Sequence, residues 1–363
     1  MRTPGILLLL GLVLAGMLAA SMSTYSGYLL AWSSVISQDV VIPLERLGDY
    51  SDGVERINIE LSITNKLRIV EALRAFFAAG EMPPLFVAWG PPYTPKDAGT
   101  FVRSLSEKFA FARSEILCES RGGRPVPMLR IQEGERTAEQ RFGVWVQARQ
   151  HAWESGSSWV ARGFGDWLTG KSPEAAWLRN NAEIVLVPIM DIDNAATGNG
   201  GKDALPQDHN RDWSDQPHWN EVKAAKAHVS DWISAKRMDV FLDLHNPAPG
   251  DPSFFYVLDD NLMTAKARQN RDRFVEQAYG RISKIKPLIP MSNRPKYTGP
   301  NYHPLWKQIS SAWVAMNGNP ETVSVCLETI WNYKNCNSAG YMAVGTALAE
   351  ATQAFLSERA RQP

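Results

Sequence analysis

Short apolar runs alternate with longer stretches of mixed polarity along most of the chain. The short runs are rich in Val, Ile, Leu and Phe, which is typical of buried strands, and the mixed stretches have the length and polarity of helices. The predicted strands are residues 127–131, 143–148, 184–188, 240–244 and 323–328. The predicted helices are residues 157–168, 220–235, part of 261–282 and 341–359. This alternation predicts an α/β fold in which helices cover both faces of a sheet.

The N-terminal part has a different pattern. An apolar segment at residues 6–18 follows Arg2, and small polar residues such as Ser21 and Ser23 come next. This order is typical of a secretory signal, and the segment is shorter than the roughly 20 residues of a spanning helix, so a signal at residues 1–22 is favoured over an uncleaved anchor. We therefore expect a secreted or periplasmic protein with no stable membrane insertion once the signal is removed.

After the signal, β-type runs at residues 40–42 and 57–63 predict a small, mainly β domain over residues 23–90. Gly90-Pro91-Pro92 marks the predicted boundary with a second domain, residues 91–363. Thr94 is a suitable helix cap, followed by Pro95 at the first helical position and Asp97 at the third, so we expect a helix from there to about Phe111.

The composition is that of a globular protein, since 44% of its 363 residues are hydrophobic and 38 basic residues balance 38 acidic ones. No long basic run interleaves with aromatic residues, so nucleic acid is not an expected partner. The three cysteines, Cys118, Cys326 and Cys336, allow at most one disulfide, for which Cys326 and Cys336 are candidates. They contain no CxxC pair for a cysteine-based zinc site.

All six histidines lie at or after position 151, so any histidine-based metal site belongs to the second domain. His151 and Glu154 leave a predicted strand three residues apart, and His245 ends another one. Two histidines and one glutamate, with a fourth position open for water, are the protein ligands of a catalytic zinc site. Taken singly, each residue is as typical of a surface turn or a hydrogen-bonded core histidine.

Two further segments suit the same chemistry. Asn210 and Arg211 can bind a carboxylate, because a guanidinium binds it through two parallel hydrogen bonds and the amide adds a donor. Glu328 ends a strongly apolar strand, where a partner or a raised pKa would suit a general base. The alternatives are a capping loop with a surface arginine and a solvated last residue of a strand.

Taken in order, these segments resemble the zinc carboxypeptidase family, and within it the branch of the cytosolic carboxypeptidases. The resemblance extends over residues 91–355 and is most specific at His151-Ala152-Trp153-Glu154, where Ala152-Trp153 replaces the Pro-Gly of that branch. Asp208-His209-Asn210-Arg211, Asp243-Leu244-His245 and Leu327-Glu328-Thr329 are similar to its three other motifs. Residues 86–94 resemble the junction between the branch's small β domain and its peptidase domain.

The resemblance implies a mixed central sheet and one Zn²⁺ ion bound by His151, Glu154 and His245. It also implies roles for four other residues: Asn210 and Arg211 bind the free C-terminal carboxylate of a peptide substrate, Glu328 is the catalytic base, and Asp208 orients a zinc-bound histidine.

Two positions depart from the family pattern. The position of the arginine that stabilises the oxyanion falls on Gly201, and we expect the neighbouring Lys202 to supply the charge. The catalytic tyrosine is assigned to Tyr302, with Tyr297 in reserve. The pocket that selects the substrate residue is expected between residues 306 and 316.

The sequence therefore predicts a secreted or periplasmic zinc metallocarboxypeptidase that removes C-terminal residues from peptides by attack of a metal-activated water. Two alternatives stay open. One is a zinc-dependent N-acyl amino acid hydrolase with the same site. The other is a non-catalytic zinc- or peptide-binding homologue, which Gly201 favours and the intact Glu328 opposes.

Overall fold

The structure is a computed structural model that describes residues 40–41, 86–87 and 90–361, except 249, 332 and 334. The chain divides into two compact units, Met1–Pro91 and Pro92–Pro363. The strands described in the first unit are β1 (Val40–Val41) and β2 (Phe86–Val87), which pair antiparallel. The predicted signal at residues 1–22 lies outside the described residues, as does the predicted β-type domain at residues 23–90 apart from these two strands and Gly90.

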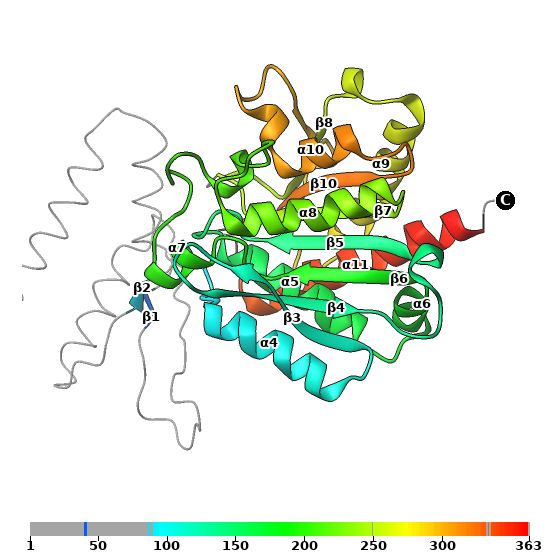
Figure 1. Cartoon of the computed structure of the whole chain (residues 1–363), viewed down its shortest axis with the longest axis horizontal. Coiled ribbons are helices and arrows are strands. Elements are labelled where there is room, and N and C mark those ends of the chain that lie inside the picture. The colour runs from blue at the N-terminus through cyan, green and yellow to red at the C-terminus, as the bar shows by residue number, and fades with distance from the viewer. Residues whose placement is uncertain are drawn as a thin grey trace, which may run out of the picture. The chain divides into compact units, whose positions relative to one another are not determined.

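The second unit is built on an eight-stranded mixed sheet in the order β3-β4-β6-β5-β7-β10-β8-β9 (Figure 1). The strands are β3 (Ala112–Glu119), β4 (Pro125–Ile131), β5 (Phe142–Ala148), β6 (Ala182–Val187), β7 (Met238–His245), β8 (Phe254–Leu258), β9 (Lys296–Thr298) and β10 (Val323–Glu328). The four central strands, β6, β5, β7 and β10, run parallel, so their carboxyl ends meet at one edge of the sheet. Ligands of open α/β sheets bind at such an edge.

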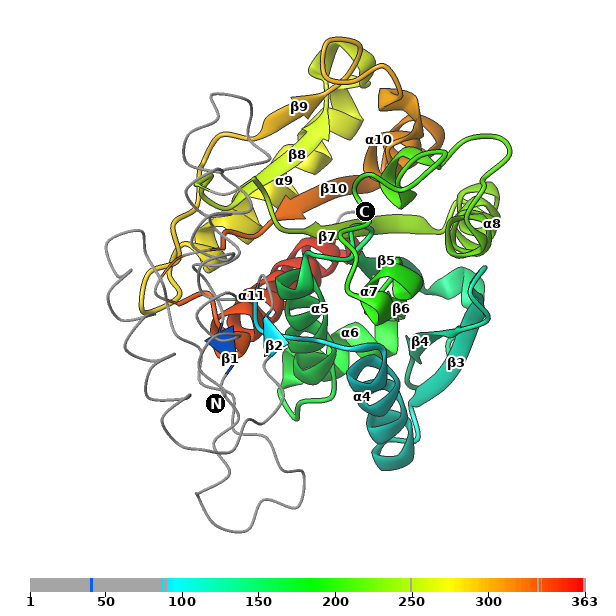
Figure 2. The same cartoon turned by 90° about the vertical axis from the view of Figure 1, so that its left-hand side faces the viewer.

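Helices cover both faces of the sheet, as the alternating pattern predicted. They are α4 (Pro95–Lys108), α5 (Ser155–Leu168), α6 (Pro173–Asn181), α7 (Ile192–Thr197), α8 (Asn220–Ser234), α9 (Ala265–Ile282), α10 (Ser310–Asn317) and α11 (Ser338–Ala360). The larger apolar core joins one face of the sheet to α5, α9 and α11, and α5 and α11 lie side by side (Figure 2). A second core joins the other face to α8.

The central strands are apolar at nearly every position because both of their faces are buried. In β5, Val144 and Val146 belong to the larger core, whereas Trp145 between them belongs to the second core. This explains why these strands were evident in the sequence as continuous apolar runs.

The predicted start of the first helix is confirmed. The Thr94 hydroxyl accepts from the amide of Asp97, the Asp97 carboxylate accepts from the amide of Thr94, and Pro95 takes the first helical position. The helix ends at Lys108, before the expected Phe111. The sequence prediction missed β3, because this edge strand leaves residues such as Arg113 and Ser114 exposed and lacks a continuous apolar run.

Cys118, Cys326 and Cys336 all lie in the described part of the chain and form no disulfide, so the optional Cys326–Cys336 pair is not bonded. No helix in the described part of the chain is both long and apolar enough to cross a membrane.

Candidate zinc centre and substrate pocket

The candidate zinc ligands meet at the carboxyl edge of the parallel strands. His151 follows β5, His245 is the last residue of β7, and Glu154 caps the start of α5. His151 and Glu154 are brought together by the turn after β5, in which Arg149 adopts a left-handed backbone conformation with φ of 62°. The Arg149 guanidinium donates to the carbonyls of Ala152 and Tyr93, and these bonds fix the turn.

The Glu154 carboxylate lies between the two imidazoles. Its Oε1 is 2.8 Å from Nδ1 of His151, and its Oε2 is 2.6 Å from Nδ1 of His245. The three side chains are buried, and their ligand atoms all lie within 4.8 Å of one another. Burial opposes ionisation of Glu154, but His151 and His245 outweigh it and hold the pKa of this carboxyl well below its usual range. An ionised carboxylate beside two imidazole nitrogens fits a zinc ion with an open fourth position.

Each histidine has a second carboxylate behind it. Asp208 Oδ1 lies 3.2 Å from Nε2 of His151, and Asp243 Oδ2 lies 3.1 Å from Nε2 of His245. A carboxylate at the far nitrogen fixes the tautomer and ring orientation of a metal-bound histidine. Asp208 therefore lies where the expected orienting role requires it.

Asp243 is the residue that the sequence reasoning missed, although a signal was present. Residues two apart on a strand share a face, so Asp243 and His245 of β7 point the same way. The Asp243 carboxylate also accepts from Gln150 Nε2 at 2.8 Å and from the Ser310 hydroxyl. These donors come from the turn after β5 and from the start of α10, and no local pattern relates them to β7.

The remaining candidate residues line one cavity beside the zinc ligands. The cavity has a volume of about 30 Å³, and its wall consists of His151, Lys202, Asn210, Arg211, Tyr256, Thr298, Tyr302, Ile309, Ser311, Cys326 and Glu328. The segment at residues 306–316, where the sequence predicted the selecting pocket, contributes Ile309 and Ser311 to the wall.

Arg211 and Asn210 are arranged to receive an anion. The 3₁₀ helix His209–Arg211 carries both, and the Asn210 side-chain oxygen accepts from the amide of Ser310 at 3.1 Å. Arg211 is buried, and its Nε has no hydrogen-bond partner among the described residues. Burying a donor without a hydrogen-bond partner raises the free energy of the folded state. A carboxylate bound here would accept a hydrogen bond from this Nε and remove that penalty.

Glu328 lies beside the zinc ligands because β10 and β7 are in register. Glu328 is the strand partner of His245, and its Oε2 has no hydrogen-bond partner among the described residues. Burial raises the pKa of Glu328 to about 7, although the charges of His245 and Lys202 lower it. A carboxyl with such a pKa exchanges a proton readily near neutral pH.

The backbone explains why position 201 carries no side chain. Gly201 has φ of 79°, and a Cβ there would lie 2.1 Å from the buried Asp191 carboxylate. The chain turns at Gly201 and brings Lys202 into the cavity wall, with Nζ 3.1 Å from Nε2 of His151. Lys202 is therefore placed to supply the positive charge that the sequence reasoning assigned to it.

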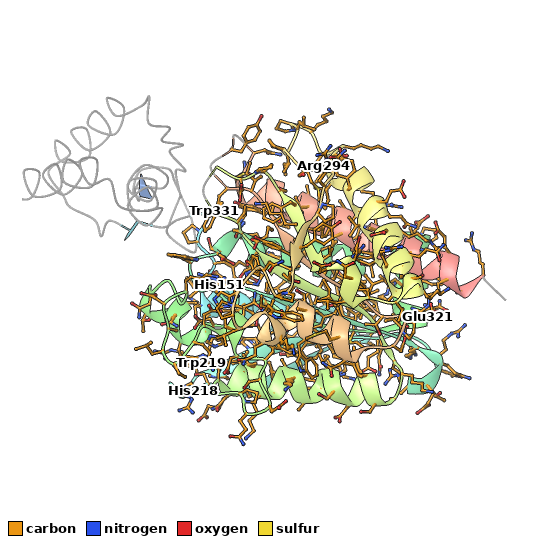
Figure 3. All side chains as sticks on the ribbon, turned by 90° about the horizontal axis from the view of Figure 1, so that it is seen from above. His151, His218, Trp219, Arg294, Glu321 and Trp331 are labelled. Atoms are coloured by element: carbon orange, nitrogen blue, oxygen red, sulfur yellow. The ribbon has the colours of Figure 1, made fainter. Side chains whose placement is uncertain are left out.

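The structure distinguishes between the two candidates for the catalytic tyrosine, because only one of them lines the cavity. Tyr302 lines the cavity, and the Arg211 guanidinium lies 6.0 Å from the centre of its ring. Tyr297 on β9 is 46% exposed and is not among the residues of the cavity wall. Figure 3 labels His151, which also lines this cavity.

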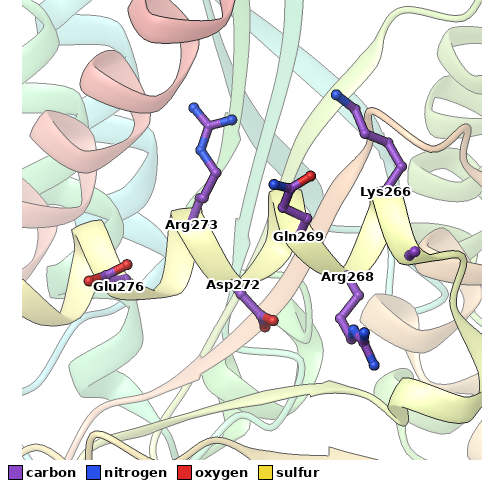
Figure 4. Close-up of a pocket in the computed structure, with 7 residues that line it drawn as sticks. Lys266, Arg268, Gln269, Asp272, Arg273 and Glu276 are labelled. Atoms are coloured by element: carbon purple, nitrogen blue, oxygen red, sulfur yellow. The ribbon is translucent and has the colours of Figure 1, made fainter.

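A larger depression of about 550 Å³ follows α9, and its wall includes Lys266, Arg268, Asp272 and Glu276 (Figure 4). All of its lining residues belong to α9, their charges are mixed, and none is a candidate zinc ligand. The smaller cavity is therefore the candidate substrate pocket, because it alone of the two adjoins the zinc ligands.

Comparisons with known proteins agree with this geometry. The profile of the zinc carboxypeptidase family matches residues 101–248, which contain all three zinc ligands. Cytosolic carboxypeptidase 4 of Homo sapiens is 25% identical over 233 residues, which cover 57% of this chain and 21% of that protein. The chain therefore matches the zinc carboxypeptidase family over residues 101–248, and its homology to the cytosolic carboxypeptidases is distant. His151, Glu154 and His245 form a His-Glu-His group that suits one zinc ion, as expected for that family.

Solved structures share the fold. The metallo-carboxypeptidase from Burkholderia cenocepacia aligns with a TM-score of 0.60 and 22% identity, over 74% of this chain and 70% of that one. The metallo-carboxypeptidase from Pseudomonas aeruginosa was solved in complex with (2-guanidinoethylmercapto)succinic acid. It aligns with a TM-score of 0.63 and 18% identity, over 93% of this chain and 84% of that one. The chain spans about a fifth of the length of the curated relatives it matches.

Proposed function

We propose that this chain is a zinc metallocarboxypeptidase that removes C-terminal residues from peptides. The observation that carries the proposal is that Arg211 and Glu328 line one cavity beside the candidate zinc ligands, and that each has a buried polar atom, Nε and Oε2, with no hydrogen-bond partner among the described residues. The guanidinium suits a terminal carboxylate, and the carboxylate suits a proton transfer at the neighbouring peptide carbonyl.

In the proposed reaction, Asn210 and Arg211 hold the terminal carboxylate and so restrict cleavage to the last peptide bond. Zinc, when bound, supplies a Lewis acid that polarises the carbonyl and lowers the pKa of a water molecule. Glu328 accepts a proton at Oε2 as water attacks and later donates it to the leaving amine. The Lys202 ammonium stabilises the negative charge that develops on the carbonyl oxygen.

An exported location is part of the same proposal. The apolar segment at residues 6–18, followed by small residues, supports secretion or transport to the periplasm. Peptides outside the cytoplasm are then the expected substrates.

The test compares three substrates of the zinc-loaded chain: a peptide with a free C-terminal carboxylate, the same peptide amidated, and an N-acyl amino acid. We expect loss of the last residue from the free-acid peptide only. An Arg211→Met variant should raise KM about tenfold or more, because a charge-assisted hydrogen bond contributes about 1.5 kcal/mol or more. Equal cleavage of the amidated peptide, or preference for the N-acyl amino acid, would contradict the proposal.

A further inference from the structure

The wall of the candidate substrate pocket has two chemically different parts. The part next to the zinc-binding residues carries the charged side chains Lys202, Arg211 and Glu328. The other part, which we call the neutral wall, consists of Tyr256, Thr298, Ile309, Ser311 and Cys326. They are a phenol, two aliphatic hydroxyls, an alkyl group and a thiol, none of which carries a formal charge near neutral pH.

The sheet register explains how the neutral wall is assembled. Cys326 lies two residues before Glu328 on β10, so the two side chains share one face of the strand. Tyr256 of β8 is the strand partner of Cys326, and Thr298 of β9 is the partner of Leu258 in β8. Three residues of the wall therefore lie on neighbouring strands, one of them on the strand that carries Glu328, and Ile309 and Ser311 complete the wall from the start of α10.

The neutral wall offers no partner for a charged substrate side chain. A buried ammonium or carboxylate without a counter-ion is strongly unfavourable. In the proposed reaction, the cations of the pocket are already engaged, Arg211 with the terminal carboxylate and Lys202 with the developing oxyanion. A charged C-terminal side chain would therefore lose its hydration without compensation.

The pocket is also small. The whole cavity has a volume of about 30 Å³, about two to three times the roughly 10–15 Å³ that a cavity needs to hold one water molecule, and the terminal carboxylate of a substrate would take part of it. Aromatic packing limits how far the pocket can widen. The centre of the Tyr256 ring lies 5.1 Å from that of Tyr302 and 5.0 Å from that of Phe254. An aromatic or long aliphatic substrate side chain would have to displace these rings.

We propose that this pocket selects a small, uncharged C-terminal residue, of the size of alanine or serine, with Tyr256 and Ser311 as the residues that set the selectivity. This inference rests on the proposed carboxypeptidase function and specifies its substrate class.

The test uses the zinc-loaded full chain and a set of peptides that differ only in the last residue: Ala, Ser, Leu, Phe, Glu and Lys. We expect kcat/KM to be at least about tenfold higher for Ala and Ser than for Phe, Glu and Lys, since a pocket discriminates roughly 10- to 200-fold for each misfit group. The Tyr256→Ala variant should shift the ratio of Leu to Ala about tenfold towards Leu.

A second variant keeps the test decisive if Tyr256→Ala fails to fold. Ser311→Asp places a carboxylate in the neutral wall and should make Lys a better C-terminal residue than Ala. Tyr279→Ala on α9, outside the pocket wall, is the matched control and should leave the substrate ranking unchanged.

The outcomes separate the two proposals. Trimming with Leu, Phe, Glu or Lys as the best residue overturns the selectivity and leaves the carboxypeptidase assignment standing. Absence of trimming for every peptide overturns the carboxypeptidase assignment, and the selectivity with it.

Discussion

At the residue scale, Lys202 is the candidate site residue that departs from the family pattern, in which an arginine stabilises the oxyanion. Its charge reaches the cavity because the turn at Gly201 excludes a side chain beside Asp191 and presents the next residue instead. An ammonium is a compact point charge without the planar fork of a guanidinium. It can stabilise an oxyanion by charge, while it imposes less geometry on the substrate than an arginine would.

This role predicts a change in kcat. In Lys202→Met, kcat for a free-acid peptide should fall about 100-fold or more, as for loss of a donor to an oxyanion, with a smaller change in KM. Lys202→Arg should retain more of the rate because it keeps the charge. Steady-state kinetics on chains of equal zinc content make the comparison. A Met variant with the native kcat would remove Lys202 from the mechanism.

At the element scale, the position of Glu154 depends on how closely α5 packs against α11. A Cβ on Gly345 would lie 2.0 Å from the carbonyl oxygen of Val160, and one on Gly163 would lie 2.1 Å from that of Met342. The two helices therefore approach each other through glycine, with backbone against backbone. Because α5 begins directly after Glu154, this close packing fixes one zinc ligand.

Gly345→Ala should therefore lower the free energy of unfolding by about 1–3 kcal/mol, since the opposing atom is backbone and cannot rotate away. Gly280→Ala in α9 is the matched control. A Cβ there has no atom within 4 Å, so alanine should stabilise the helix by up to about 1 kcal/mol. Chemical denaturation measures both. Equal effects of the two substitutions would contradict the packing account.

A buried histidine precedes the candidate substrate-binding residues Asn210 and Arg211 in the 3₁₀ helix His209–Arg211. His209 precedes Asn210, lies 3.8 Å from Asp191 and 3.6 Å from Glu221, and stacks on Trp219, which Figure 3 labels at the start of α8. Burial alone lowers the pKa of His209, but Glu221, Asp191 and Asp212 outweigh it and raise this pKa above its usual value.

The sign of the resulting pH dependence follows from linkage. A histidine with a raised pKa in the folded state contributes its full stability below its unfolded pKa of roughly 6.5 and loses it as pH rises through the folded pKa. His209→Gln should therefore lower the free energy of unfolding most at about pH 6, by about 3 kcal/mol, and less at about pH 9. Denaturation of both chains at each pH measures the difference. A constant or growing difference would show that His209 is not held in its charged form.

At the scale of the whole molecule, the α/β architecture was predictable because the central strands are buried on both faces. β5, β6, β7 and β10 are continuous apolar runs, and their strand ends were found to within a few residues. β3 and β9, at the edges of the sheet, were not found because partial exposure and short length remove the apolar signal. The five-residue strand β8, between β10 and β9, was also missed.

The candidate site was predictable where its residues form local motifs, and less so where distant segments meet. His151 and Glu154 are three residues apart, and Asp243 could have been found from its spacing to His245. Ser310, which donates to Asp243, lies 67 residues from it, and only the packing of α10 on the sheet brings the two together. Likewise, the reason for a glycine at position 201 is seen only in the folded chain, where the Asp191 carboxylate occupies the space that a Cβ would need.

The central claim is that this zinc site and Glu328 form one hydrolytic unit. The most direct measurement is zinc content by elemental analysis, together with C-terminal trimming of a free-acid peptide, for the native and Glu328→Gln chains. We predict about one zinc in each chain, trimming by the native chain that stops on chelation and returns with zinc, and a loss of about 100-fold or more in Glu328→Gln. Undiminished trimming by Glu328→Gln, or by the zinc-free chain, would contradict the account.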